Sequence, residues 1–146
     1  MNPRDFFTLA ERLVAESTES AQRSAVSRAY YAVFHEARML VESCGFRFAS
    51  TAETHSKLIY CIMAANDADL DFVGQKLGSL RTIRNTADYD LGITNFASSS
   101  FAISQLQVAR LSFEALERAK SRTKTFRPLV RQYAASVLKK VLEGDE

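Results

Sequence analysis

An arginine interrupts an apolar stripe in the second half of the chain. Residues 69–87 predict a helix whose inward positions are Leu70, Val73, Leu77, Leu80, Arg84 and Ala87. A guanidinium without a partner among apolar side chains is costly, so Arg84 needs a carboxylate, a second subunit or a ligand phosphate. Asp88, four residues later, can supply an ion pair within the helix. A phosphate-binding arginine is the alternative.

A polar line follows the helix predicted from about residue 20 to Cys44. Its members recur at intervals of four and three residues, opposite the apolar seam: Ser24, Arg28, Tyr31, His35, Arg38 and Glu42. Such a face could grip or cleave a phosphodiester, because an unperturbed imidazole suits proton transfer near neutral pH. The other interpretation is a solvated face or a subunit contact.

Two glycines lie four residues apart on the helix that carries Arg84. Gly74 and Gly78 share a face with Arg81 and Asn85. Each glycine costs a helix about 1 kcal/mol relative to alanine, which favours a packing role. Either a dimer contact or an intrachain helix crossing would supply it.

The net charge of +2 hides a strongly basic segment near the C-terminus. Residues 1–117 hold 11 Lys/Arg and 14 Asp/Glu, whereas residues 118–140 hold eight basic residues and no acid. The basic residues are Arg118, Lys120, Arg122, Lys124, Arg127, Arg131, Lys139 and Lys140. We expect this segment to attract phosphates or an acidic protein, although basic residues are also favoured at helix C-termini.

The remaining elements are also predicted to be helical, so the expected fold is all-α. Helices are predicted over residues 3–16, 20–44, 50–65, 69–87, 98–116 and 128–141, the third with a Ser50/Glu53 capping box. We expect Phe46 and Phe48 to be exposed between the second and third helices. The predicted organisation is an up-and-down bundle of four or five helices in residues 1–122, followed by a basic linker and an amphipathic helix in residues 123–146.

Composition argues against several classes of protein. No apolar run is long enough to span a membrane and the N-terminus lacks a secretion signal, so the cytoplasm is the expected location. Cys44 and Cys61 are predicted to be core thiols. With His35 and His55 as the only imidazoles, and with His55 expected at the surface or in a helix cap, we expect neither a metal site nor a cofactor.

Two segments together resemble a known family. Residues 23–35 read RSAVSRAYYAVFH and residues 84–90 read RNTADYD. They resemble HEPN-domain proteins, and are similar to the small bacterial members that carry RAYYA-F-H on the second helix and R-x-x-A-D-Y at the end of the fourth. The resemblance covers roughly residues 5 to 120.

The resemblance implies a helical bundle that forms a homodimer and is often encoded with a small nucleotidyltransferase as a toxin and antitoxin pair. Active relatives are metal-independent endoribonucleases that use an arginine, a polar residue and a histidine a few residues farther on. Arg84 and Asn85 match the start of this signature, but Tyr89, Asp90 and Leu91 occupy the positions where the histidine belongs.

Three functions follow from the resemblance and this departure from it. The chain can be an endoribonuclease that uses Arg84 with Tyr89, Asp88 or His35, a silent module that binds RNA or a nucleotide, or a regulatory partner of another protein. The residues expected to contact nucleic acid are Asn85, Arg28, Arg81, Arg118, Lys120, Arg122 and Lys124. With a nucleotidyltransferase partner, Tyr89 would be a site for nucleotide modification, by analogy only.

Overall fold

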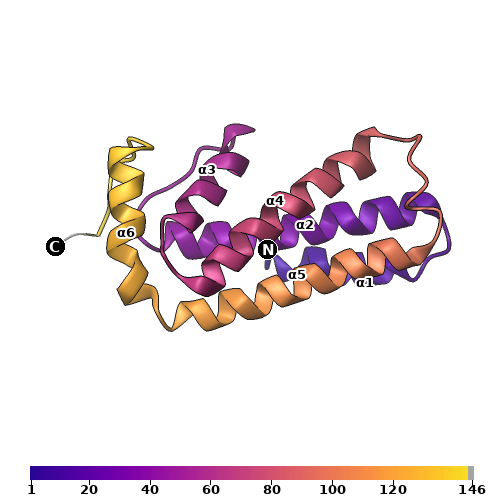
Figure 1. Ribbon diagram of the computed structural model, residues 1–146, viewed down its shortest axis with the longest axis horizontal. Helices are drawn as coiled ribbons and strands as arrows, with labels where there is room; N and C mark the ends of the chain where they lie inside the picture. Colours follow the sequence, from indigo (N-terminus) through magenta and orange to yellow (C-terminus); the bar gives the residue numbers. More distant parts are fainter. Residues whose placement is uncertain (145–146) are drawn as a thin grey trace. The chain divides into compact units, whose positions relative to one another are not determined.

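Apolar residues recur with helical periodicity along the chain, and the residues that the structure describes form six helices (Figure 1). The computed structural model describes residues 1–144, and within these it contains no β-strand. The helices are α1 (Arg4–Val14), α2 (Glu19–Glu42), α3 (Glu53–Met63), α4 (Ala68–Tyr89), α5 (Ser99–Lys120) and α6 (Thr123–Ser136). The predicted all-α class is confirmed.

The sixth helix begins earlier than predicted. Residues 123–127, predicted as a linker, form the first turns of α6, and Pro128 lies inside this helix instead of starting it. Phe126 is 1% exposed, and its burial holds the segment against the rest of its unit. The helix starts without a side-chain cap, while the Thr123 hydroxyl donates to the carbonyl of Lys120 in the preceding turn.

The segment before α3 also differs from the prediction. Ala52, not Ser50, is the N-cap of α3 and makes no side-chain cap, so the predicted capping box is not formed. Phe46 and Phe48 are 0% and 5% exposed, which contradicts their predicted exposure. Their rings meet edge to face with centroids 5.4 Å apart, so apolar burial determines the course of this loop.

The described residues group into two compact units, and three of the helices run through both. The first unit comprises Met1–Glu36 and Lys76–Phe113, and the second comprises Ala37–Gln75 and the chain from Glu114 onward. The boundary predicted after residue 122 falls just before α6, inside the second unit. As a domain boundary it stays a prediction.

In the first unit, α1 packs on α2 and α5 through aromatic and ionic contacts. Phe7 meets Phe113 edge to face, with ring centroids 5.2 Å apart. The Arg4 guanidinium lies 4.7 Å from the centroid of the Phe113 ring and 3.4 Å from a Glu36 carboxylate oxygen. The amphipathic α1 thus covers the apolar sides of two longer helices.

A buried arginine pins the loop between α4 and α5 in the same unit. The Arg23 side chain donates to the carbonyls of Ala87, Asp90 and Ile93 at 2.8, 3.0 and 3.0 Å. Its guanidinium also lies 4.9 Å from the centroid of the Phe96 ring, which is completely buried. Hydrogen bonds from one side chain therefore replace the regular backbone pairing that the loop lacks.

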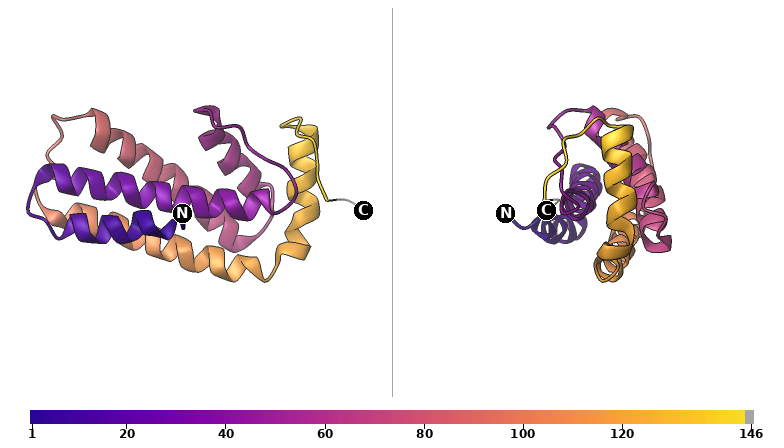
Figure 2. Two further views of the ribbon diagram at one scale, coloured as in Figure 1. Left: turned by 180° about the vertical axis from the view of Figure 1, so that it is seen from behind. Right: turned by 90° about the vertical axis from the view of Figure 1, so that its left-hand side faces the viewer.

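In the second unit, α3 contacts α6, and the two helices can be compared in Figures 1 and 2.

Burial raises the pKa of the Cys61 thiol to about 12 and also raises that of Cys44. Both thiols are buried, so the prediction of core cysteines is confirmed.

The two glycines of α4 have different surroundings. A Cβ atom on Gly74 would lie 2.6 Å from the Met63 sulfur of α3, whereas a Cβ on Gly78 would meet nothing within 4 Å. Gly74 therefore serves the intrachain helix crossing that was one of two alternatives. Its close neighbour lies in the same unit.

Candidate functional site

Tyr31 lies at the centre of a cluster of cationic and aromatic side chains in the first unit. Its hydroxyl accepts a hydrogen bond from Arg84 Nη1 at 3.1 Å. The Arg84 guanidinium lies 5.3 Å from the centroid of the Tyr31 ring and 5.5 Å from that of Tyr30. Packing of α2 on α4 thus places the arginine of one motif against the paired tyrosines of the other.

Arg84 forms a long ion pair with Asp88. The Arg84 side chain is 13% exposed, and its Nη1 lies 3.7 Å from Asp88 Oδ2. That carboxylate oxygen also accepts a 3.4 Å hydrogen bond from the Ser27 hydroxyl. Arg84 Nε is buried and has no hydrogen-bond partner among residues 1–144. The expected ion pair with Asp88 is therefore present, but the Nε–H of the guanidinium remains an unused hydrogen-bond donor.

Arg28 and His35 also contact the Tyr31 ring. The Arg28 guanidinium lies 5.2 Å from the ring centroids of both Tyr31 and Phe6. The His35 imidazole stacks on Tyr31 and on Phe6, with centroids 6.3 and 6.0 Å apart. All of these side chains except Tyr30 and Ser27 retain some exposed surface, so a ligand can reach them.

Tyr30 supports this cluster from the core. It is 1% exposed, and burial raises the pKa of its phenol well above the usual range, although the charges of Arg81 and Arg84 act in the opposite direction. The phenol therefore stays protonated near neutral pH. The two arginines lie near a neutral ring, so Tyr30 does not neutralise their charge.

The cluster combines guanidinium groups for an anion, an imidazole for proton transfer and a carboxylate. Of the three residues predicted to act with Arg84, Asp88 contacts it directly and His35 contacts the same tyrosine ring. Tyr89, the last residue of α4, is 79% exposed, and Asn85 is also exposed. Within residues 1–144, no group of three or more His, Cys, Asp or Glu side chains is arranged to hold a metal ion.

The far end of the polar line has a structural role in the second unit. The Arg38 side chain donates to the Phe48 carbonyl at 2.8 Å, and a Glu42 carboxylate oxygen accepts from the Phe48 N–H at 2.8 Å. These two side chains position the buried loop that precedes α3. The polar line of α2 therefore has two roles. Arg28, Tyr31 and His35 belong to the Tyr31 cluster, whereas Arg38 and Glu42 are structural.

The basic segment is partly neutralised by acids from the start of α4. Arg122 contacts Asp67 and Asp69, each at 2.7 Å, and Arg118 contacts Asp69 at 2.9 Å. Lys120 pairs with Glu117, whereas Lys124 is exposed. Linear charge counting separates these acids from the basic segment, and folding brings them together. Binding of nucleic acid by Arg118, Lys120, Arg122 and Lys124 stays a prediction.

These ion pairs predict a pH-dependent stability. Hydrogen bonds from Arg122 and Arg118 hold the pKa values of Asp67 and Asp69 below their usual range. A carboxylate whose pKa is lowered on folding stabilises the native state above the unfolded pKa of about 4, and this contribution disappears as pH falls through the lowered value. Arg122→Met should therefore reduce the free energy of unfolding at pH 7, and the difference from the wild type should shrink below about pH 4. Urea unfolding across this pH range measures it; a constant difference would contradict the assignment.

Two functional candidates of the first unit escaped the sequence analysis. Arg23 and Gln22 are 8% and 2% exposed, and neither was assigned a role. A signal for Arg23 exists, because it extends the apolar seam of α2 formed by Val26 and Tyr30 and so breaks an apolar stripe as Arg84 does. No comparable pattern distinguishes Gln22.

Comparison of the chain with known protein families, with curated proteins and with solved structures finds no match.

Proposed function

We propose that this protein acts on RNA as a HEPN-like protein, with the Tyr31 cluster as the site that meets the phosphodiester. The observation that carries the proposal is Arg84, a mostly buried guanidinium with an unpartnered Nε at the meeting point of the two motifs. A buried cation with unused donors is suited to bind a phosphate oxygen.

In the proposed reaction, Arg84 and Arg28 stabilise the negative charge that develops on the phosphorane, and the His35 imidazole transfers the proton. His35 takes the proton of the ribose 2′-hydroxyl as this oxygen bonds to the adjacent phosphorus, which forms a 2′,3′-cyclic phosphate. The P–O5′ bond breaks, and the 5′-oxygen of the next nucleotide leaves with the proton that the His35 imidazolium returns. His35 takes the role that the missing motif histidine has in the resembling family, because it contacts the ring to which Arg84 is bound.

A second function, a silent module that binds RNA without cleaving it, is favoured by the contact between Arg84 and Asp88. A neighbouring carboxylate partly offsets the charge that a transition state would require of the guanidinium. The two functions share the same phosphate site and differ only in turnover.

The proposal extends to the setting of the protein. We propose a cytoplasmic homodimer that works with a cognate antitoxin, for which a small nucleotidyltransferase is the candidate. Within residues 1–144, no helix has both the length and the apolar character that a membrane crossing requires.

Removal of the Arg84 guanidinium tests the proposal directly. Arg84→Ala should weaken binding to a mixed single-stranded RNA pool by about tenfold or more, because hydrogen bonds to a charged group contribute about 1.5–3 kcal/mol each. Fluorescence anisotropy in EDTA measures affinity, and gel analysis of the same pool measures cleavage.

Arg12→Ala is the matched control, because Arg12 is an exposed arginine of the same unit and its loss changes the net charge equally. Equal affinities of the wild type and the Arg84→Ala variant, or equal losses in both variants, would contradict the proposed site. Cleavage that persists in EDTA and requires Arg84 supports the nuclease, whereas binding without cleavage supports the silent module.

A further inference from the structure

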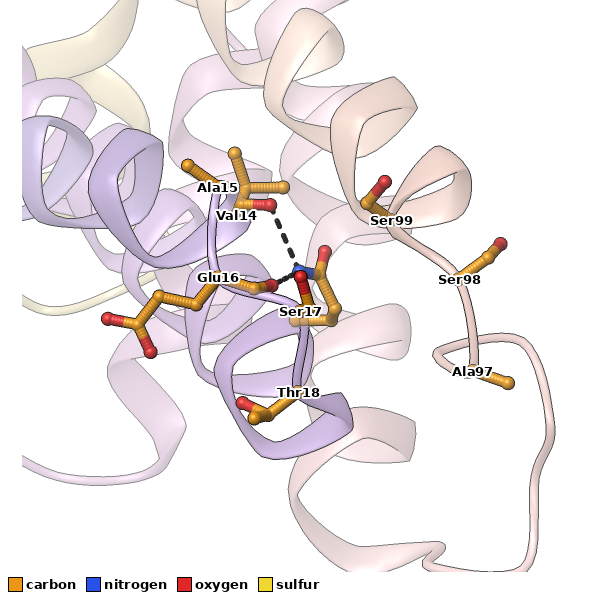
Figure 3. A pocket seen from close by; sticks show the side chains of 9 residues that line it. Val14, Ala15, Glu16, Ser17, Thr18, Ala97, Ser98 and Ser99 are labelled. Carbon is orange, nitrogen blue, oxygen red and sulfur yellow. Dashed lines mark hydrogen bonds between the residues drawn. The ribbon is translucent and has the colours of Figure 1, made fainter.

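A pocket in the first unit lies between the end of α1, the start of α2 and the start of α5. Residues 14–18 form one wall and residues 97–99 the other, with Gln22 between them. Its cavity volume is about 210 Å³. Figure 3 shows Val14 and Glu16 on one side and Ser98 and Ser99 on the other. None of these residues belongs to the Tyr31 cluster.

Gln22 presents an unused acceptor in this pocket. Its side-chain amide nitrogen donates to the carbonyls of Val14 and Glu16 at 3.0 and 2.6 Å, the dashed lines of Figure 3. Two carbonyl partners identify this atom as the nitrogen, because an oxygen could not donate to them. The amide orientation is therefore defined, and Oε1 is left buried without a hydrogen-bond partner among residues 1–144.

The opposite wall supplies donors. Ser99 is the first residue of α5, a helix of 22 residues, and the first N–H groups of a helix have no acceptor within it. The hydroxyls of Ser98 and Ser99 are exposed there. By contrast, the start of α2 is already capped, because Thr18 Oγ1 accepts from the N–H of Ala21 at 3.3 Å.

The charges around the pocket favour a neutral ligand. Glu16 is the one charged residue in the lining, and Figure 3 shows its carboxylate directed away from Ser98 and Ser99. The lining therefore offers no cation to hold an inorganic anion at the start of α5. The complementary ligand carries an N–H donor for Gln22 Oε1 beside a carbonyl acceptor for the N–H and hydroxyl donors of the α5 start.

We infer that this pocket binds the lactam edge of a nucleobase, in which a ring N–H lies beside a carbonyl oxygen, with uracil as the smallest example. The N–H donates to Gln22 Oε1, and the carbonyl accepts from the first turn of α5. Gln22 Oε1 is almost inaccessible in this structure, so binding requires a small movement of the pocket wall. That the base comes from RNA, and not from a free nucleoside, rests on the proposed function.

The pocket wall is otherwise well supported. Phe96, next to residues 97–99, is completely buried and meets Phe101 edge to face at 5.3 Å. Arg23, next to Gln22, anchors the loop that leads into this wall through the carbonyls of Asp90 and Ile93. The donors and the acceptor are thus held by side chains that a ligand need not displace.

Titration of the ¹⁵N-labelled full chain with uridine tests the inference. We expect shifts of the Gln22 side-chain amide and of the Ser99 backbone amide. 3-Methyluridine lacks the ring N–H that Gln22 Oε1 would accept, and should bind about tenfold more weakly. Ser98→Trp should block uridine by filling the mouth of the pocket, whereas Ser104→Trp, an exposed position of α5 outside the lining, should not.

The outcomes separate this inference from the proposed function. Equal binding of uridine and 3-methyluridine, or shifts located elsewhere, would overturn the pocket assignment and leave the Arg84 result on RNA unaffected. Selective uridine binding that Ser98→Trp abolishes supports the pocket, even if RNA affinity does not depend on Arg84. In that case the ligand is a free nucleoside, whereas weaker binding of a uridine-rich oligonucleotide by both Arg84→Ala and Ser98→Trp supports an RNA base.

Discussion

His35→Ala is expected to lower the rate of RNA cleavage by about 10²–10⁴-fold, the range typical of a general acid or base. The imidazole stacks on Tyr31, whose hydroxyl is bound to Arg84, so it lies beside the proposed phosphate site. Its loss should leave RNA affinity nearly unchanged, because the imidazole moves a proton while Arg84 and Arg28 bind the charge. Single-turnover cleavage with saturating enzyme separates the two effects.

His55→Ala provides the matched control, since His55 is the other histidine of the chain and lies in α3 of the second unit. It should cleave at the wild-type rate. If His35→Ala also cleaves at that rate, proton transfer has been assigned to the wrong residue. A wild-type protein that binds RNA through Arg84 without cleaving it would instead establish the silent module.

Arg23→Met is expected to lower the free energy of unfolding by about 3–5 kcal/mol, one of the largest effects of any single substitution in the chain. Methionine preserves the length of the side chain but removes every hydrogen bond to the carbonyls of Ala87, Asp90 and Ile93. It also leaves Glu19 without its 2.9 Å ion pair. The carbonyls belong to the last turn of α4 and to the loop between α4 and α5, and their desolvation would no longer be compensated.

Urea denaturation followed by circular dichroism measures this effect. Arg12→Met is the control, because Arg12 is an exposed arginine of α1 in the same unit, and it should change stability by less than about 0.5 kcal/mol. A loss of similar size in both variants would show that the charge, and not the hydrogen bonds of Arg23, matters.

The ends of the helices show where local signals are sufficient. Asn2 accepts a hydrogen bond from the Arg4 N–H at the start of α1, and Gly45 adopts a φ of +107° after α2. Both features involve only residues that are close neighbours in the chain, so residue type alone is enough to signal them. At Pro128 the local rule was wrong, since burial of Phe126 started α6 earlier.

The candidate site was only partly predictable. Arg84 and His35 stood out because each is a chemically active side chain at a defined position on a helix face. That they share Tyr31 as a neighbour depends on how α2 packs on α4, and helix periodicity does not specify this. Tyr89 was named from the family resemblance and Asp88 from its spacing to Arg84. Tyr89 is 79% exposed, whereas Asp88 contacts Arg84.

By itself, the sequence determined the all-α class, the approximate span of each helix and the buried thiols, since these follow from apolar periodicity and residue type within a few turns. Tertiary structure alone decided which charges far apart in the sequence are paired. Asp67 meets Arg122 across 55 residues, and Arg23 reaches the Ile93 carbonyl across 70. Ion pairs and hydrogen bonds depend on distance in space, not on separation in the sequence. The acids that partly neutralise the basic segment, and the unpartnered Oε1 of Gln22, could therefore be identified only in the folded chain.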